Sequence, residues 1–458
     1  MVDFITIPAM PRGILFAGLA LGLMGLANTV CAKDLRLTSN DRILIMAPHP
    51  DDEVLCCGGI IQDAVQEHLP IKIVFLTYGD YNKWSFTVYS HHPVFRPKAM
   101  RAMGEVRHDE SIAAAKVLGI PPDQLIFLGY PDFETINIWD DHWGSSPAFE
   151  SKHTRVRAVP YSTAYRPGAA YKGEEILHDL EAIIKDFHPT KVFVSHPADD
   201  MPDHRALYLF THVALWDLAK DEAPAVYSYL VHLRTWPQSR GLHTNQSLNP
   251  PSFLKSPTQW LTIPLNAMQV NKKHEALEKH RTQCVYSDRY LTSFVRSNEL
   301  FGDFSFLPMS SQINMRNENA AGAESPEHMA DIEKADSEDW RVAIDSADLM
   351  FSGSLSRTFR KSTEAWVAIY GYRRDTPFER MPKIYVKFGN IHHVVYDQRQ
   401  PILDSKVQML HDHRRFILRI PLKTLNRPER IFASCRVIQP RLPFDWASWR
   451  ILELPGSY

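Results

Sequence analysis

The sequence has little of what marks several common protein classes. Five cysteines among 458 residues are too few for a disulfide-dense scaffold. The 51 Lys and Arg residues are balanced by 53 Asp and Glu residues, so the chain lacks the basic surplus of a protein that wraps nucleic acid. There is no internal repeat, P-loop or GxGxxG motif. A hydrophobic content of 44% with 23% charged residues also excludes a polytopic membrane protein, a collagen and a wholly disordered chain.

An apolar run near the N-terminus indicates a targeting segment. The run, residues 13–27, follows Arg12 and is followed by the compact residues 30–32. It is shorter than the ~20 residues of a membrane span and has the proportions of a secretory signal. We expect residues 1–32 to be a signal peptide or an uncleaved N-terminal anchor, and the protein to be exported, periplasmic or secreted. The adjacent Cys56 and Cys57 are expected to be buried in a helix.

Four continuous apolar runs alternate with helical patterns in the first half of the chain. The runs cover residues 42–48, 71–77, 125–129 and 191–195, and the helical stretches lie near 54–68, 102–118, 174–187 and 203–219. Apolar runs separated by helices indicate a parallel sheet that is covered on both faces. We therefore expect an α/β domain over residues 33–308, with a Rossmann-like, mostly parallel sheet flanked by helices.

The pattern changes after residue 308. Between residues 318 and 339 there are eight acidic residues and one basic residue, which is typical of a linker. Beyond it, short runs alternate with a period of two, at residues 364–372, 383–389, 392–397, 415–422 and 430–438. We expect an acidic linker over 309–339 and a smaller β-sandwich-like accessory domain over 340–458.

The motif APHPDDE, residues 47–53, directly follows the first apolar run. Asp51, Asp52 and Glu53 would suit the start of a helix, where the dipole favours negative charge. That does not account for His49 or for three adjacent negative charges, whereas a bound cation explains both. Imidazole and carboxylate groups are ligands that zinc accepts.

A second cluster of His and Asp, SHPADDMPDH, occupies residues 195–204 after the fourth apolar run. Ligands of open parallel sheets bind beyond the carboxyl ends of the strands, and two such ends can be neighbours. His49, Asp52 and His204 would then supply three ligands and leave a position for water, as in a catalytic zinc site.

These motifs resemble those of the LmbE-like family of zinc-dependent N-acetylglucosaminyl deacetylases, which includes the GlcNAc-phosphatidylinositol de-N-acetylases (PIG-L). The PHPDDE signature is complete, and RHDESIAAAKVLGI (107–120), FLGYPD (127–132) and PDHRA (202–206) occur in the family's order. The stretch 280–301 resembles the end of many members. The likeness covers roughly residues 40–305.

The resemblance implies a hydrolase that removes the N-acetyl group from an N-acetylated amino sugar, in a GlcNAc-type glycan or glycoconjugate. It implies that His49, Asp52 and His204 bind Zn²⁺ and that Asp51 is the catalytic base. Ferrous iron (Fe²⁺) could occupy the same site. The implied partner is the sugar substrate; we expect no nucleic acid, and membrane contact only through an uncleaved N-terminal segment.

Three further residues have two interpretations each. Arg107 and Asp132 resemble substrate-binding residues of the family. Arg107 could instead pair with Glu110 on a helix surface, and Asp132 could be a turn residue. Asp203 could orient His204 from behind or cap the helix.

The sequence departs from the family at Met201, where many members have a histidine that helps to protonate the leaving group. Met cannot donate a proton. His196 is the nearest histidine in the sequence that could replace it, although it could equally be a residue at the end of a strand. The alternative function is therefore a carbohydrate-binding protein that keeps the metal and has lost turnover.

Overall fold

A computed structural model describes residues 33–454. The description leaves out residues 92–94, 222, 234, 253, 255–257, 305, 309–312, 317–338, 346, 355–363, 390–392, 404, 412–414 and 439–444. The expected signal peptide or anchor at residues 1–32 lies outside the described residues. Among the helices of the described part, none combines the length and the hydropathy that crossing a membrane requires.

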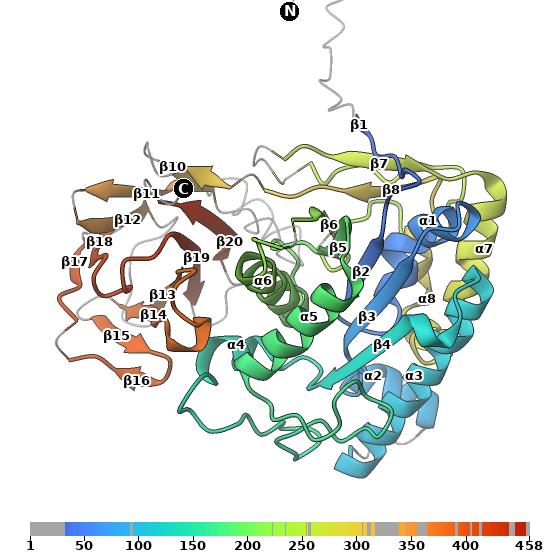
Figure 1. Cartoon of the computed structure of the whole chain (residues 1–458), viewed down its shortest axis with the longest axis horizontal. Coiled ribbons are helices and arrows are strands. Elements are labelled where there is room, and N and C mark those ends of the chain that lie inside the picture. The colour runs from blue at the N-terminus through green and yellow to red at the C-terminus, as the bar shows by residue number, and fades with distance from the viewer. Residues whose placement is uncertain are drawn as a thin grey trace, which may run out of the picture. The chain divides into compact units, whose positions relative to one another are not determined.

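A five-stranded parallel sheet forms the centre of the first part of the chain (Figure 1). Its strands, in spatial order, are β4 (Leu125–Tyr130), β3 (Ile71–Thr77), β2 (Ile43–Ala47), β5 (Lys191–Ser195) and β6 (Ala225–Tyr229). Helices α5 (Gly173–Phe187) and α6 (Pro202–Asp217) cover one face, and α1 (Asp52–Gln66) and α3 (Pro97–Leu118) cover the other, with α7 (Ala267–Leu277) packed against α1 and α3. The expected α/β fold, with its four strands and four helices, is confirmed.

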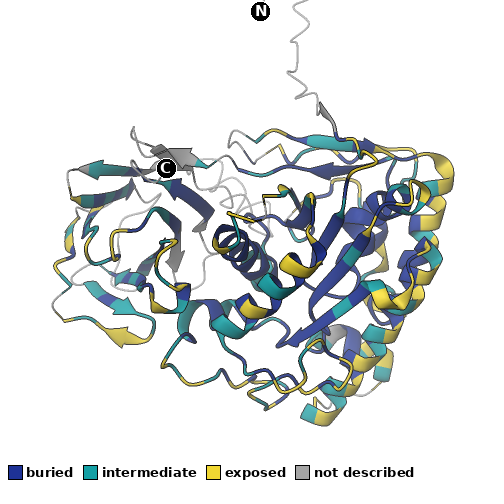
Figure 2. Cartoon of the chain, in the orientation of Figure 1, coloured by how far each residue is buried: buried dark blue, intermediate teal, exposed yellow. Residues whose placement is uncertain are grey.

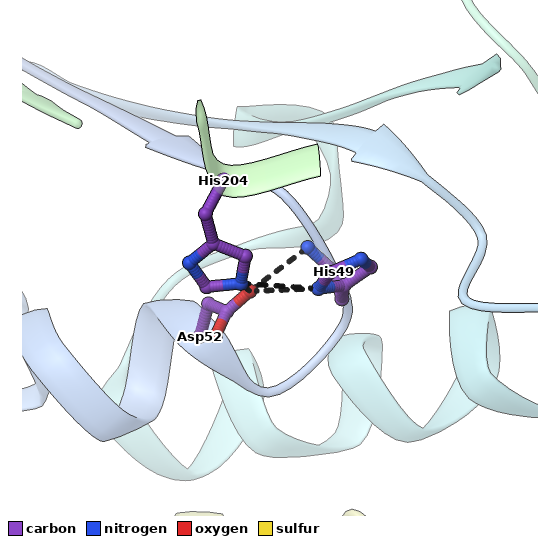
Figure 3. Close-up of side chains that lie close together, drawn as sticks. All are labelled: His49, Asp52 and His204. Atoms are coloured by element: carbon purple, nitrogen blue, oxygen red, sulfur yellow. Dashed lines mark hydrogen bonds and ion pairs between the residues drawn. The ribbon is translucent and has the colours of Figure 1, made fainter. Parts of the chain in front are cut away.

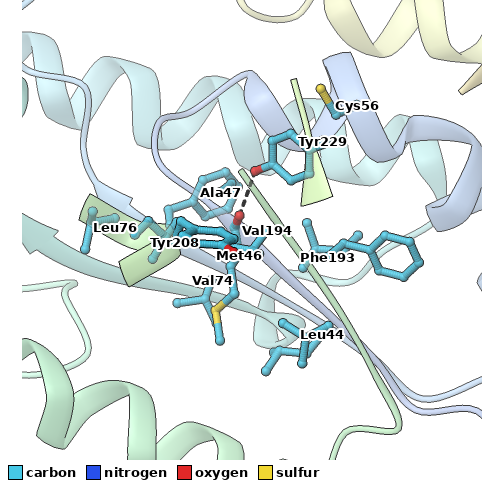
Figure 4. Packing of buried hydrophobic residues seen from close by; sticks show 14 of the residues in the cluster. Leu44, Met46, Ala47, Cys56, Val74, Leu76, Phe193, Val194, Tyr208 and Tyr229 are labelled. Atoms are coloured by element: carbon cyan, nitrogen blue, oxygen red, sulfur yellow. Dashed lines mark hydrogen bonds between the residues drawn. The ribbon is translucent and has the colours of Figure 1, made fainter. Parts of the chain in front are cut away.

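The continuous apolar composition of the strands is explained by their burial. Every residue of β2 is buried, because helices lie against both faces of the sheet (Figure 2). In the core, Leu44 and Met46 of β2 lie among side chains of β3, β5 and α6, and the Tyr229 hydroxyl donates a hydrogen bond of 2.6 Å to the Met46 carbonyl (Figure 4). Cys56 and Cys57 are buried in α1 as free thiols, as expected.

Smaller elements surround this sheet. A three-stranded sheet contains β1 (Lys33–Asp34), β7 (Leu261–Pro264) and β8 (Asn298–Phe301). The remaining helices are α2 (Lys83–Ser90), α4 (Thr135–Asp141) and α8 (Arg281–Leu291), with short 3-10 turns at Pro122–Gln124, Thr292–Phe294 and Phe378–Arg380. The sequence patterns did not predict the three-stranded sheet.

The C-terminal part consists of two sheets in which all pairings but one are antiparallel. One sheet has the order β10 (Ile313–Arg316), β11 (Asp339–Asp345), β12 (Asp348–Ser354), β18 (Arg415–Pro421), β17 (Gln408–His411). The other has the order β16 (Gln400–Pro401), β15 (His393–Asp397), β14 (Lys383–Phe388), β13 (Glu364–Tyr372), β19 (Arg430–Ile438), β20 (Asp445–Glu453), β9 (Leu307–Pro308), with β20 and β9 parallel. Phe351 and Leu418 from the first sheet and Val367 and Val386 from the second share one hydrophobic core, as a sandwich requires.

Two observations bear on the expected linker and boundary. Residues 313–316, inside the expected linker, form strand β10 rather than an irregular connection, and 317–338 lie outside the described residues. Trp139 of α4 is completely buried, with its ring 5.2 Å from that of Phe378 and 5.5 Å from that of Phe432. The hydrophobic core of the α/β part therefore continues into the β-rich part, and the division of the chain into separate domains stays a prediction.

Candidate functional site

The two sequence motifs meet because their strands are neighbours. Strands β2 and β5 are hydrogen-bonded in parallel, so their carboxyl ends lie at the same edge of the sheet. His49 follows β2, Asp52 is the first residue of α1, and His204 lies in the first turn of α6, after β5. This is the edge at which open α/β sheets bind their ligands.

Three candidate ligand atoms converge at this edge (Figure 3). The Asp52 Oδ2 atom lies 3.2 Å from His49 Nδ1 and 3.2 Å from His204 Nε2, and the two ring nitrogens are 3.3 Å apart. His49 is 5% exposed, and Asp52 and His204 are completely buried. The structure therefore brings together all three residues that the sequence singled out as ligands.

The geometry of this triangle fits a tetrahedral metal ion. Zinc–nitrogen and zinc–oxygen bonds of about 2.0–2.1 Å imply ligand–ligand separations of about 3.3 Å in a tetrahedral site. The three observed separations, 3.2, 3.2 and 3.3 Å, match that value. The second oxygen of Asp52, Oδ1, is buried and has no hydrogen-bond partner among the described residues. A cation would compensate this buried negative charge.

Two carboxylates lie behind the imidazole of His49 and a third lies behind that of His204. The Nε2 atom of His49 lies 3.1 Å from Asp132 Oδ1 and 3.1 Å from Asp203 Oδ2. The Nδ1 atom of His204 lies 3.2 Å from Asp199 Oδ2. Carboxylates in this position fix the ring orientation and the tautomer of metal-binding histidines.

Both interpretations of Asp203 need correction here, whereas the substrate role of Asp132 stays a prediction. Asp203 orients His49 rather than His204, because its chain neighbour His204 turns its free ring nitrogen towards Asp199 instead. Asp132 is only 1% exposed and faces His49, so in this structure its carboxylate contacts an imidazole and the Tyr81 backbone N–H. The alternative that Asp203 caps the helix is also wrong, because no side chain caps the N-terminus of α6. The Asp203 carboxylate instead accepts hydrogen bonds from the backbone N–H groups of Phe133 and Thr135 and from the Thr135 hydroxyl.

The four carboxylates govern the protonation of the two imidazoles. Burial lowers the pKa of His49, but Asp132, Asp203 and Asp52 outweigh it and raise the pKa well above its usual value. For His204, burial likewise lowers the pKa, and Asp199 and Asp52 raise it to about 9. Two imidazoles enclosed by four buried carboxylates make a strongly negative environment, which favours a cation.

Asp51 is held in an unusual backbone conformation beside the triangle. Its φ angle is +126°, a region that residues with a Cβ rarely adopt. The residue is 8% exposed, and burial, only partly offset by the Arg107 guanidinium, raises the pKa of its carboxyl to about 7. Its backbone N–H donates a hydrogen bond of 2.9 Å to Glu53. Its assigned role as base stays a prediction.

Arg107 fastens the loop that carries Asp51. Its Nη2 atom lies 3.5 Å from Asp51 Oδ2 and donates to the Pro50 carbonyl, while Nη1 donates to the Gly79 carbonyl. Gly79 has a φ of +66°, and a Cβ at that position would collide with the guanidinium, so glycine is required there. Glu110 binds Thr282 instead of Arg107, so the alternative of a surface helix pair is wrong. The substrate role of Arg107 stays a prediction.

His196 does not have the environment of a proton donor. Its ring is completely buried, 4.6 Å from the ring of Phe304, and its Nδ1 accepts a hydrogen bond from the Ala198 N–H. Burial lowers its pKa to about 3, so the ring is neutral near pH 7. The suggestion that His196 replaces the family histidine lost at Met201 is therefore not supported by its surroundings.

The sequence reasoning missed three buried residues near the triangle. Asp199 binds His204, as described, and Glu53 accepts a contact of 3.2 Å from Nε2 of His280, whose Nδ1 has no hydrogen-bond partner in the described part of the chain. Asp199 lies in the second motif, and His280 begins the stretch 280–301 that resembles the family, so both signals were present. The pairing of each carboxylate with an imidazole depends on the fold. It cannot be derived from the spacing of these residues in the sequence.

The fold and the site define an α/β protein with a candidate metal centre at the carboxyl edge of its parallel sheet. Residues 44–215 match the family model PIG-L, which is described as GlcNAc-PI de-N-acetylase. The matched range includes His49, Asp52 and His204.

Individual relatives match over smaller shares or at low identity. A probable N-acetyl-alpha-D-glucosaminyl L-malate deacetylase 2 of Bacillus anthracis is 34% identical to this chain over 101 residues. The match covers 21% of this chain and 41% of that protein, so the chain spans less than half the length of this curated relative. Among solved structures, a conserved protein of Thermus thermophilus is 22% identical, with 56% of this chain and 84% of that chain covered and a TM-score of 0.33. An N,N'-diacetylchitobiose deacetylase of Pyrococcus horikoshii is 16% identical, with 57% and 82% covered and a TM-score of 0.33.

Proposed function

We propose that this protein is an exported, zinc-dependent hydrolase that removes the acetyl group from an N-acetylated amino sugar. The observation that carries the proposal is the triangle of His49, Asp52 and His204, with Asp51 beside it, inside a region that matches the family of GlcNAc-PI de-N-acetylases. The carbohydrate-binding alternative without turnover is not favoured, because the candidate ligands and Asp51 are all present and both the family and the curated relative are described as deacetylases.

His49, Asp52 and His204 would hold the ion. Two imidazoles and one carboxylate suit zinc, and ferrous iron accepts the same donors. When bound, such an ion polarises an amide carbonyl and lowers the pKa of a water molecule. Asp132, Asp203 and Asp199 would keep both rings turned towards the ion, since each lies against the ring nitrogen that points away from it.

Asp51 would move the proton. As water attacks the amide carbon, the Asp51 carboxylate accepts a proton from it, and the same group returns the proton to the sugar nitrogen when the C–N bond breaks. Arg107, 3.5 Å from Asp51, holds this carboxylate in place. One group serving in both steps would also compensate for Met201, which has no proton to give.

The substrate class rests on the relatives. The family description and the Bacillus anthracis protein both concern N-acetylglucosaminyl compounds. A GlcNAc-type glycan or glycoconjugate outside the cytoplasm would agree with the targeting segment expected at residues 1–32. The β-rich C-terminal part has no assigned role in this proposal.

The test is acetate release by the purified chain. N-acetylglucosamine oligomers are incubated with the zinc-loaded protein, with the protein after chelator treatment, and with that protein after zinc is restored. We expect acetate with zinc, none after chelation, and recovery on restoration. Stoichiometric zinc without acetate from any N-acetylated sugar in a panel would reject the hydrolase and favour the carbohydrate-binding alternative.

A further inference from the structure

Phe133 has a backbone conformation that its side chain disfavours. Its φ angle is +62°, in the left-handed region, which is unfavourable for a bulky residue and accessible to glycine. The side chain is only half-buried, so the burial of a large apolar group does not fully explain why a phenylalanine stands there. Strain of this kind persists where the surroundings enforce it, and it concentrates at binding sites.

The Phe133 ring belongs to an aromatic wall beside the metal centre. Its centroid is 6.2 Å from the imidazole of His49 and 5.2 Å from the ring of Tyr81, which it meets edge-on. His153 stacks on Tyr81 at 3.3 Å, and the Lys83 ammonium lies 4.9 Å from the Tyr81 ring. The side chains of this wall are half-buried, so parts of them face solvent.

The wall is tied to the same carboxylates that orient His49. The Phe133 N–H donates to Asp203 Oδ2, and the Tyr81 N–H donates to Asp132 Oδ2 at 2.7 Å. Asp203 Oδ2 and Asp132 Oδ1 both face Nε2 of His49 at 3.1 Å. Two carboxylates therefore set the position of the candidate ligand and of both rings together, which explains how the strained backbone at Phe133 is maintained.

We propose that the Phe133 ring, supported by Tyr81, contacts the pyranose ring of the sugar whose N-acetyl group lies at the metal centre, and so determines substrate affinity. This inference rests on the proposed function. The negative face of an aromatic ring attracts the C–H groups on the flat face of a pyranose. The Phe133 ring lies next to the imidazole of His49, a candidate metal ligand. It is therefore placed to contact the sugar unit whose N-acetyl group reacts, and not a more distant unit of the chain.

The test compares four substitutions at Phe133 and a control. Phe133→Gly and Phe133→Ala remove the ring, and Phe133→Tyr and Phe133→Trp keep an aromatic ring. The control pair is His188→Gly and His188→Ala, at the C-cap of α5, where φ is +51° and the side chain is exposed. For each zinc-loaded variant, zinc content, melting temperature, kcat and KM with N-acetylglucosamine oligomers, and the Kd of the same oligomers are measured.

We expect Phe133→Gly and Phe133→Ala to raise KM and Kd about tenfold with zinc content unchanged, and the aromatic variants to keep the wild-type values. Phe133→Gly should melt about 1–3 °C above Phe133→Ala, because only glycine relieves the left-handed strain. The His188 pair should show the same difference in melting temperature with no change in KM. A KM and Kd unchanged in Phe133→Gly would overturn the inference.

A second comparison separates the sugar from the acyl group. If the ring contacts the pyranose, Phe133→Gly raises KM by the same factor for N-acetyl and N-propionyl substrates. A gain in activity on the N-propionyl substrate, with an unchanged KM for the N-acetyl one, would place Phe133 in the acyl pocket and overturn the inference. If the wild type releases acetate but Phe133→Gly leaves KM and Kd unchanged, only this inference is refuted. If Phe133→Gly weakens oligomer binding but the wild type releases no acetate, only the proposed hydrolase is refuted.

Discussion

The carboxylate of Asp203 contacts His49, 154 residues away in the chain, at a distance of 3.1 Å, although its immediate neighbour in sequence is the other candidate ligand, His204. The same carboxylate also accepts the N–H groups of Phe133 and Thr135. Asp203 therefore joins three separate segments around one imidazole, and His204 is oriented by Asp199 instead.

This arrangement predicts how the metal affinity responds to the carboxylates behind the two rings. Asp203→Asn and Asp199→Asn should each weaken zinc binding about 10–100-fold, because a neutral amide stabilises the ring orientation less well than a carboxylate. Zinc affinity is measured by competition with a chromophoric chelator. Asp123→Asn, at an exposed position, is the matched control and should bind as the wild type does. Unchanged affinity in both variants would show that these carboxylates do not support the ligands.

Replacement of Asp51 separates binding from chemistry. Asp51→Asn should retain stoichiometric zinc, because Asp51 contributes no atom to the triangle of ligand atoms. Its kcat should fall about 10²–10⁴-fold, the usual contribution of a proton-transferring group. Zinc content and the rate of acetate release are measured on the same preparation, with Asp123→Asn as the control. Activity within a few-fold of wild type would remove Asp51 as the base.

The environment of His196 predicts that it takes no part in proton transfer. Because burial lowers its pKa to about 3, the ring is a neutral imidazole near pH 7 and not the imidazolium that a general acid requires. His196→Phe should leave the pH profile of kcat unchanged, even if packing against Phe304 is disturbed and the melting temperature falls. A new dependence of kcat on pH in this variant would show that His196 participates after all.

The buried side chain of Lys383 should make the free energy of unfolding depend on pH. This effect does not involve the candidate metal centre. The Lys383 side chain is completely buried, donates to the carbonyls of Phe378 and Met381, and lies 3.9 Å from the Phe378 ring. Burial lowers its pKa to about 7, against the upward influence of nearby carboxylates, which are Asp397, Glu379 and Glu174.

Between pH 7 and about pH 10 the unfolded chain binds this proton and the folded chain does not, so Lys383 makes the stability rise with pH there. Its contribution to the slope approaches about 1.4 kcal/mol per pH unit. Urea unfolding of the wild type and Lys383→Met at pH 7, 8 and 9 should show a smaller slope in the variant. Equal slopes would mean that the lysine is charged in the folded state.

A substitution at Trp139 can show whether the α/β part and the C-terminal β-rich part of the chain unfold together. The Trp139 ring contacts Phe210 of the α/β part at 5.0 Å and Phe378 and Phe432 of the C-terminal part. Trp139→Ala should cost roughly 3–5 kcal/mol and shift a single unfolding transition. The half-exposed Tyr165, substituted by Ala, is the control and should shift the transition little. Two transitions, of which only one moves, would instead support independent domains.

The sequence by itself determined the α/β architecture and pointed to the three candidate ligands. Continuous apolar runs separated by helical patterns indicate strands covered on both faces, and motifs at the carboxyl ends of two such strands in a parallel sheet lie at one edge. His49, Asp52 and His204 follow the ends of two such strands, so the sequence alone predicts that they lie together. The strands 313–316 and 261–264 were not predicted, because they are short and pair with segments that lie further along the chain.

Only the tertiary structure decided what each acid does. Asp132, Asp199 and Asp203 look alike in the sequence, and local spacing suggested that Asp203 serves its neighbour. The chain direction at the start of α6 turns the Asp203 carboxylate towards His49, and the loop between β5 and α6 brings Asp199 to His204. Side-chain direction depends on backbone conformation and on the segments packed opposite it, so contacts between residues 154 positions apart cannot be read from a motif.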